Sequence, residues 1–513
     1  MKLKKYYSII IPLFFFTISF LLLGRHEMWR DEIQHWLLAR DSTNIYTLIE
    51  NLKYEGSPGL WHFILFLITR IFNDPYYMQV LHVLISSSTI FIIFKYSPFN
   101  KIQKILLTFN YFLFFEYSLI ARSYVISVFL VFIYCALFKK KENNSIKIAL
   151  VLFLLSNSGI FGLILAVCLF GTTILESLLR VYKKKYELRD FIRKESFSIF
   201  IIFSGFLSSL LQLFYNIPKD ETYRNLPLTL PSINKILLFL KYILRAYIPI
   251  PDFNLSNWWG SSILKDNNLL AFLSIIFLML VISIFINYLF KRPSALFLYL
   301  SISFILSLFF LLKFSGSLRH HGLIFIGLIA SLWIYNYCLD FNKNKKIKFG
   351  SKALTFATTS IFSLQAFAGI SAASLDYMLP FSSAKETADF INKIDLSKYE
   401  IISHGDAQGS AILGYIKNKK AFYYLTTGKK GSFIKWNKLR AKNNKIIAQR
   451  NEDINNKILQ NIVEEIIAND KQVILVLNTP LKELTSSNEN FREVFVSQKS
   501  AVKDEIFYVY LYQ

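Results

Sequence analysis

The chain has 513 residues, of which 54% are hydrophobic and 17% aromatic, and its mean hydropathy is +0.39. This composition is too apolar for one soluble domain and too polar for a protein buried wholly in a membrane, so we expect a polytopic, mainly α-helical bundle with a soluble part. The net charge of +24 does not indicate nucleic-acid binding, because Lys and Arg cluster in short loops between apolar runs, as in cytoplasmic loops of membrane proteins.

Apolar segments predict eleven membrane spans. The first follows three lysines and lacks a small-x-small cleavage site, so we expect an uncleaved helix with its N-terminus in the cytoplasm. The predicted spans are residues 7–23, 76–94, 102–117, 119–138, 146–157, 159–180, 196–215, 268–290, 294–312, 321–339 and 353–372.

A further apolar run, residues 60–72, is not counted as a span. Its roughly thirteen residues are short for a bilayer core of about 30 Å. If the run lies at the outer interface instead, every basic loop faces the cytoplasm, and the C-terminus lies outside. These loops are residues 95–104, 139–147, 180–194, 291–292 and 343–352.

Two long segments are then predicted outside the membrane. Residues 24–75 contain an amphipathic stretch and three tryptophans that suit the headgroup level. Residues 216–267 contain an amphipathic segment, 233–248, and the pair Trp258-Trp259. A loop of this length in a compact membrane protein is usually a functional lid.

Residues 1–372 are predicted to form the membrane domain and residues 373–513 a small extracytoplasmic α/β domain. The three cysteines lie in apolar stretches and are interpreted as packing residues, not as a disulfide framework or zinc site. Periodicity in the second domain predicts helices at 385–394, 408–416 and 454–468, and strands at 400–403, 421–425, 473–477, 492–496 and 506–512.

The first predicted outer segment begins with an acidic pair, Asp31-Glu32, shortly after the first span. A carboxylate at a boundary between water and membrane can act as general base on a sugar or lipid hydroxyl, or ligate a divalent cation. The alternative is that Asp31 caps a helix that begins at Ile33.

Other polar groups are expected on the same side of the membrane. Glu55 and His62 bracket a turn set by Pro58 and can reach the cavity of Asp31, or the turn is solvated surface. Arg122 lies a few residues into the membrane, where a guanidinium needs a partner. A phosphate fits, and the alternatives are snorkelling to headgroups or pairing with Glu116.

A basic run, Arg319-His320-His321, precedes the tenth span. It can bind an anion, a metal ion or a proton, or it contacts lipid headgroups. Together with the preceding motifs, this basic run predicts a site in which carboxylates face cationic groups at one surface of the membrane. The carboxylates are Asp31, Glu32 and Glu55, and the cationic groups are Arg122, Arg319 and His320.

Over roughly residues 1–370 the chain resembles the GT-C superfamily of integral membrane glycosyltransferases. It is most similar to bacterial relatives of protein O-mannosyltransferases and of the aminoarabinose transferase that modifies lipid A. The acidic motif of their first outer loop is matched by Arg30-Asp31-Glu32, and their basic late loop by Arg319-His320-His321. Their aromatic-Glu-x-Pro-Pro-Leu turn is matched by Tyr54-Glu55-Gly56-Ser57-Pro58-Gly59-Leu60, with Gly59 for the second proline, and their Ala-Arg-Pro-Tyr motif by Ala121-Arg122-Ser123-Tyr124.

The resemblance implies an inverting sugar transfer from a polyprenyl-phosphate-linked donor to an acceptor saccharide, lipid or protein, outside the cytoplasmic membrane. It implies Asp31 as general base, with Glu32 second, and closure of residues 216–267 over the acceptor. Relatives differ in whether they hold a divalent metal, so a metal stays open. The implied donor-phosphate ligands are Arg122, Tyr124, Arg319, His320 and His321, and the metal or substrate contacts are Glu55, His62 and Glu116.

Two other classes of protein remain open. A lipid-linked saccharide transporter would show internal repeats and ionisable groups at mid-membrane, whereas the charges here cluster at helix mouths. A polysaccharide ligase or polymerase would use similar lipid-linked substrates without this acidic motif in its first loop. The richness in Lys, Asn, Ile and Phe is typical of an AT-rich bacterial genome.

Overall fold

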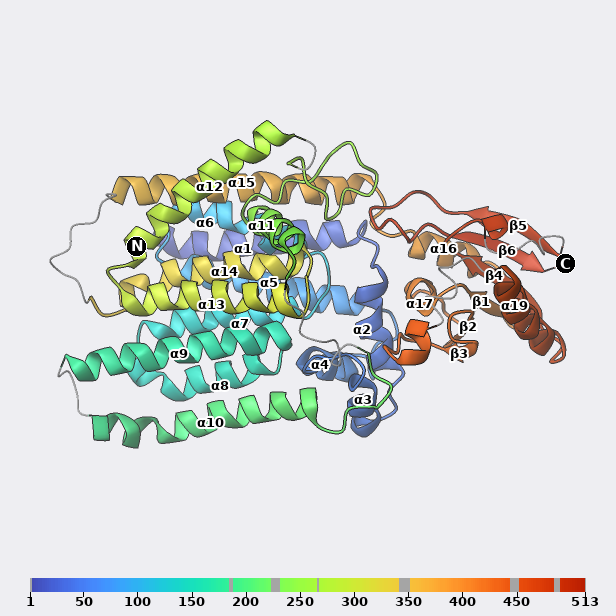
Figure 1. Cartoon of the computed structure of the whole chain (residues 1–513), viewed down its shortest axis with the longest axis horizontal. Coiled ribbons are helices and arrows are strands. Elements are labelled where there is room, and N and C mark those ends of the chain that lie inside the picture. Colours follow the sequence, from blue (N-terminus) through green and yellow to red (C-terminus); the bar gives the residue numbers. More distant parts are fainter. Residues whose placement is uncertain are drawn as a thin grey trace.

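The computed structural model describes residues 2–183, 188–222, 231–264, 267–340, 351–442, 452–483 and 490–512. Most of the predicted loop 343–352, and parts of the predicted lid 216–267, lie outside these ranges. A helical bundle carries a C-terminal domain at one end, here called the site end (Figure 1). Between bundle and domain lie three short helices, α2 (Arg30–Arg40), α3 (Ile45–Leu52) and α4 (Leu60–Ile68).

Long apolar helices build the bundle because their side chains can be buried against one another or turned toward lipid. Two 3₁₀ turns, η2 (Lys141–Asn143) and η3 (Tyr335–Tyr337), extend or join them. The helices are α1 (Lys2–Leu23), α5 (Tyr76–Tyr96), α6 (Lys101–Thr108), α7 (Tyr124–Phe138), α8 (Ser145–Ser156), α9 (Ile160–Tyr182), α10 (Leu188–Phe214), α11 (Ile233–Tyr247), α12 (Asn268–Leu289), α13 (Pro293–Leu312), α14 (Leu318–Ile334) and α15 (Ser351–Met378).

Among the described residues, seven helices are long and apolar enough to cross a membrane. They comprise α5, α9, α12, α13, α15, most of α10, and α14 together with η3. Shorter apolar helices come from α1, α7 and α8. The chain is therefore a multi-pass membrane protein. Helix α14 is buried along nearly its whole length, whereas α12 turns most of its surface outward.

The sequence predicts one continuous span over residues 102–117, and this prediction is wrong. Helix α6 ends at Thr108, and a separate π-helical turn, η1 (Tyr111–Glu116), follows. Asn110 separates them, because its side-chain oxygen accepts the N–H of Leu113 at 2.7 Å and begins a new turn. Gly369 of α15 packs against this break, where a side chain would collide with backbone. Helix α7 likewise begins at Tyr124, so the irregular residues 117–123 carry Arg122 to the site end.

Ion pairs join charged loops at the end of the bundle opposite the site end. Glu176 of α9 is contacted by Lys141 at 3.3 Å and by Arg180 at 2.9 Å. Two of the basic loops that the sequence predicts on the cytoplasmic side, 139–147 and 180–194, therefore meet at one end.

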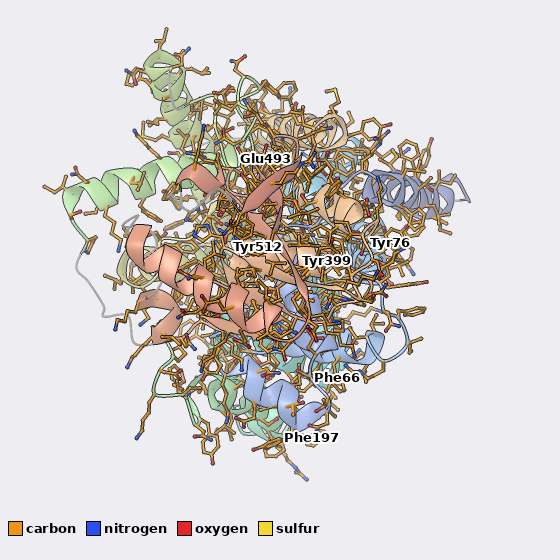
Figure 2. All side chains as sticks on the ribbon, turned by 90° about the vertical axis from the view of Figure 1, so that its right-hand side faces the viewer. Phe66, Tyr76, Phe197, Tyr399, Glu493 and Tyr512 are labelled. Atoms are coloured by element: carbon orange, nitrogen blue, oxygen red, sulfur yellow. The ribbon has the colours of Figure 1, made fainter. Side chains whose placement is uncertain are left out.

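A six-stranded mixed sheet and its helices form the C-terminal domain (Figure 2). The strand order is β3-β2-β1-β4-β6-β5, with β1 parallel to β2 and β4 and the other pairs antiparallel. The sequence predicts every strand except β3, with small errors at the ends. The elements are α16 (Ala384–Ile391), β1 (Tyr399–Ser403), α17 (Asp406–Leu413), β2 (Phe422–Tyr424), β3 (Lys429–Gly431), α19 (Glu452–Ile467), β4 (Gln472–Leu477), η4 (Leu481–Glu483), β5 (Phe491–Val496) and β6 (Tyr508–Tyr512).

Helix α2 is packed between the bundle and the C-terminal domain, with α4 on one side and α17 on the other. Gly414, which follows α17, lies so close to Ile33 that a side chain would come within 2.6 Å of it. Arg30 at the start of α2 pairs with Asp504 at 2.7 Å. Residues that are far away in the sequence therefore hold α2, the helix that carries Asp31 and Glu32, in place.

Candidate active site

Asp31 lies in the first turn of α2, where two arginines meet it. Its Oδ2 accepts from Arg122 at 2.5 Å and from Arg319 at 3.2 Å. The three residues come from α2, from the irregular segment before α7 and from the start of α14. The structure thus brings together three of the predicted site residues, Asp31, Arg122 and Arg319.

The two guanidinium groups keep Asp31 ionised. Burial favours the neutral acid, but Arg122 and then Arg319 outweigh it and hold the pKa of this carboxyl below its usual range. Helix α2 already begins at Arg30, so the alternative that Asp31 caps a helix starting at Ile33 is wrong. About a quarter of the Asp31 side chain, 24%, stays exposed, which leaves it open to a substrate.

Glu32 has a different environment from its neighbour, because it is fully buried and both its oxygens are occupied. Oε1 accepts the backbone N–H of Ala121 at 2.5 Å, and Oε2 accepts the N–H of Trp29 at 3.3 Å. Glu32 thus ties α2 to the residue that precedes Arg122. These contacts define a positioning role for Glu32.

His26 is a site residue that the sequence analysis missed. Its Nδ1 lies 2.9 Å from Asp376 of α15, and its Nε2 lies 3.2 Å from Glu32. Burial lowers the pKa of a histidine, but Asp376 and Glu32 reverse this and raise the pKa of His26 to about 10. An imidazolium between two carboxylates links α15 to α2. The 350 residues between His26 and Asp376 hide this pairing from local sequence patterns.

Two tryptophans stack against Arg319. Its guanidinium lies 5.2 Å from the ring centre of Trp29 and 5.5 Å from that of Trp259. Trp259 also donates to Glu116 at 3.3 Å. The predicted lid 216–267 therefore contributes to the site through Trp259, and Glu116 is not the ion-pair partner of Arg122.

Glu55 is connected to the C-terminal domain through Gln34. The Gln34 amide donates to Glu55 at 2.7 Å and to the backbone oxygen of Ile434 at 3.0 Å, and it accepts the Ile434 N–H at 2.8 Å. Burial raises the pKa of Glu55 to about 7, although Gln34 and Arg122 oppose the rise. The turn is therefore not solvated surface, and sequence gave no signal for Gln34 or Ile434.

His62 pairs with His35 of α2, and their facing ring nitrogens are 2.7 Å apart. Burial lowers the pKa of His62 to about 3, so the imidazole is neutral. The outer nitrogens, Nε2 of His35 and Nδ1 of His62, are buried without a hydrogen-bond partner among the described residues. The sequence predicts that His62 can reach the cavity of Asp31, and the structure gives His62 a partner in His35 instead.

Tyr124, His320 and His321 form local contacts around the start of α14. The Tyr124 hydroxyl bonds Nε2 of His320 at 2.8 Å, and Nδ1 of His320 accepts the N–H of Ser317 at 2.8 Å. His321 bonds the backbone oxygen of Ser315 at 2.9 Å. These contacts orient α14 and Arg319, and neither histidine contacts Asp31 in the structure.

Within the described ranges, no three His, Cys, Asp or Glu side chains are grouped to hold a metal ion. The described residues around Asp31 therefore provide no set of three such ligands for the divalent metal that the sequence analysis leaves open.

No protein-family model matches this chain, and no curated protein matches it. The resemblance to the GT-C superfamily consequently rests on the motifs around Asp31, Glu55, Arg122 and Arg319.

Proposed function

We propose that the chain is a membrane glycosyltransferase that moves a sugar from a polyprenyl-phosphate-linked donor to an acceptor hydroxyl, with inversion. The observation that carries this proposal is the partly exposed carboxylate of Asp31 between Arg122 and Arg319. The carboxylate can take a proton and the two guanidinium groups can hold a phosphate, and all three groups lie within a few ångströms of one another. Residues 1–372 would supply the catalysis, and residues 373–513 would cover the site.

The two arginines would bind the donor phosphate. Guanidinium groups match phosphate oxygens bidentately, and burial strengthens the attraction. In the structure, Asp31 contacts both cations through one oxygen, and Nε of each arginine is buried without a hydrogen-bond partner among the described residues. We infer that the donor phosphate displaces this carboxylate oxygen. Once Asp31 shares Arg122 and Arg319 with the phosphate, the pKa of its carboxyl would rise from its lowered value. Asp31 would then be a stronger base.

Transfer would then be a single displacement. The acceptor oxygen attacks the anomeric carbon from the face opposite the phosphate, while Asp31 takes the hydroxyl proton. The bond between the anomeric carbon and the phosphate oxygen breaks, and its electron pair leaves with the polyprenyl phosphate. Arg122 and Arg319 stabilise the negative charge that develops on this leaving group.

The site would face outward from the cytoplasmic membrane, with the N-terminus in the cytoplasm and the C-terminal domain outside. Support comes from the basic loops that meet around Glu176 at the opposite end of the bundle. Basic loops concentrate on the cytoplasmic side of bacterial membrane proteins.

The test is sugar transfer from radiolabelled polyprenyl-phosphate sugars in inverted and right-side-out vesicles. Wild type is compared with Asp31→Asn and with Asp41→Asn, a control just after the same helix, where Asp41 pairs with its neighbour Arg40. We expect transfer by wild type and the control but not by Asp31→Asn. Equal transfer by all three would remove Asp31 as the base. Donor that crosses the bilayer without transfer would identify a transporter.

A further inference from the structure

A cleft lies at the site end, away from the residues that contact Asp31. Its volume is about 560 Å³. The ends of α1 and α15 form one wall, and α16 with the residues after it forms the other. It is therefore a junction between the bundle and the C-terminal domain, and Asp31, Arg122 and Arg319 do not line it.

Charges of both signs line this cleft. Lys385, Glu386 and Asp389 follow one face of α16, and Lys393 comes one turn later. Arg25 faces them from the end of α1 and stacks on Tyr377, whose ring centre is 5.5 Å away. A pocket with fixed cations and carboxylates suits a ligand that carries both charges close together.

Within the described ranges, Glu27 lines the cleft with a carboxyl group that lacks a hydrogen-bond partner at one oxygen. Its Oε2 is buried and has no hydrogen-bond partner among the described residues. Burial raises the pKa of Glu27 to about 8. A primary ammonium at Oε2 would offset this burial, because it brings a positive charge and three N–H groups to the ionised carboxylate. Because the described residues provide no three-ligand metal set, an organic ammonium fits Glu27 and its neighbour Asp389 better than a bare metal ion.

Exposed apolar side chains lie at the ends of α1 and α15, where Met378 lines the cleft and Leu21 comes three residues before the lining residue Gly24. Leu21 of α1 is 68% exposed, and Met378 of α15 is 67% exposed. Inside the cleft, the rings of Phe390 and Phe495 stack with their centres 4.6 Å apart. A soluble ligand would gain nothing from the exposed flank, whereas acyl chains would cover it.

We propose that this cleft binds the headgroup of a zwitterionic phospholipid that carries a primary ammonium. The ammonium would lie at Glu27 and Asp389, the phosphate between Arg25 and Lys393, and the acyl chains along Leu21 and Met378. This inference does not depend on the glycosyltransferase proposal.

The cleft is connected to the candidate active site by one short chain of contacts. Asp376 lines the cleft and holds His26, and His26 in turn contacts Glu32 beside Asp31. A bound lipid would therefore touch the same wall that positions α2.

The experiment measures lipid binding to the purified full-length chain by native mass spectrometry. Phosphatidylethanolamine is titrated against phosphatidylglycerol with identical acyl chains. We expect phosphatidylethanolamine to bind at least about tenfold more tightly, the scale of one charged hydrogen bond. Equal affinity for the two lipids would overturn the proposal. Soluble O-phosphoethanolamine should bind far more weakly, and equal binding by it would overturn the assignment to a lipid.

Variants test the residues. Glu27→Gln should weaken phosphatidylethanolamine binding about tenfold, whereas the control Glu464→Gln, on the exposed face of α19, should leave it unchanged. If Glu27→Gln fails to fold, Lys393→Ala serves instead, because Lys393 is exposed and its loss should weaken binding of both lipids. Unchanged binding in the folded variant would overturn the proposed site.

Discussion

At the scale of single residues, the acidic pair divides into two roles that its sequence cannot separate. Asp31 and Glu32 are adjacent and chemically alike, yet Asp31 is partly open and held by arginines, whereas Glu32 is fully buried and bonded to backbone. Adjacent residues on a helix point about 100° apart, so Asp31 faces the candidate site and Glu32 faces the buried interior.

Exchange of Arg122 for lysine tests phosphate recognition. Arg122→Lys keeps a positive charge but loses the planar fork, so we expect the KM for donor to rise about tenfold with a smaller change in kcat. Steady-state kinetics with labelled donor measure both constants. Arg40→Lys, at the far end of α2, is the matched control. A fall in kcat with an unchanged KM would contradict a role in donor binding.

The ion-paired His26 predicts how stability depends on pH. Its pKa is about 10 when folded, against 6.5 for the free side chain, so its stabilisation is complete below about pH 6.5 and is lost as pH rises through 10. His26→Gln should therefore lower the Tm most at about pH 6.5 and just below, and the difference from wild type should shrink as the pH rises toward 10. A difference in Tm that does not change over this range would contradict the account.

At the scale of elements, α2 is the helix on which the site depends. The sequence predicts an amphipathic stretch in residues 24–75, and α3 confirms it, because Leu48 and Leu52 are buried on one side of that helix. For α2 the prediction is wrong, since residues 32–39 are buried all round the helix, polar side chains included. The break at Asn110 was not predictable from hydropathy, since an apolar run hides the side-chain contact that ends α6. The irregular residues 117–123, which follow η1, are what bring Arg122 to Asp31.

Glu32 provides the test at this scale. Glu32→Gln keeps an oxygen that can accept the N–H of Ala121, so we expect transfer to fall only about tenfold, whereas Glu32→Ala should lower both transfer and Tm. Transfer assays and thermal unfolding of the two variants separate these outcomes. If Glu32→Gln abolished transfer with an unchanged Tm, Glu32 would be a catalytic group.

At the scale of the whole molecule, the C-terminal domain contacts the candidate site. Its residue Ile434 holds Gln34, and Gln34 holds Glu55. The order of helices and strands in this domain follows from periodicity in the sequence. Its contact with α2 does not, because Gln34 and Ile434 are 400 residues apart and neither belongs to a recognisable motif.

Loss of the Gln34 amide should loosen this contact. Gln34→Leu leaves Glu55 and the backbone of Ile434 without their partners, so we expect faster amide hydrogen exchange around residues 432–437 and weaker transfer. Gln460→Leu, on exposed α19, is the control. Unchanged exchange at 432–437 would show that the domain is held in place by other contacts.

The central claim is that Asp31 acts as the base and occupies the phosphate site until donor arrives. Donor binding and transfer are therefore measured together for Asp31→Asn, with polyprenyl-phosphate sugar titrated onto the purified protein. The account predicts donor affinity at least equal to wild type, because Arg122 and Arg319 lose a competing carboxylate, with transfer at least about 100-fold slower. Transfer at the wild-type rate, or loss of donor binding, would contradict it.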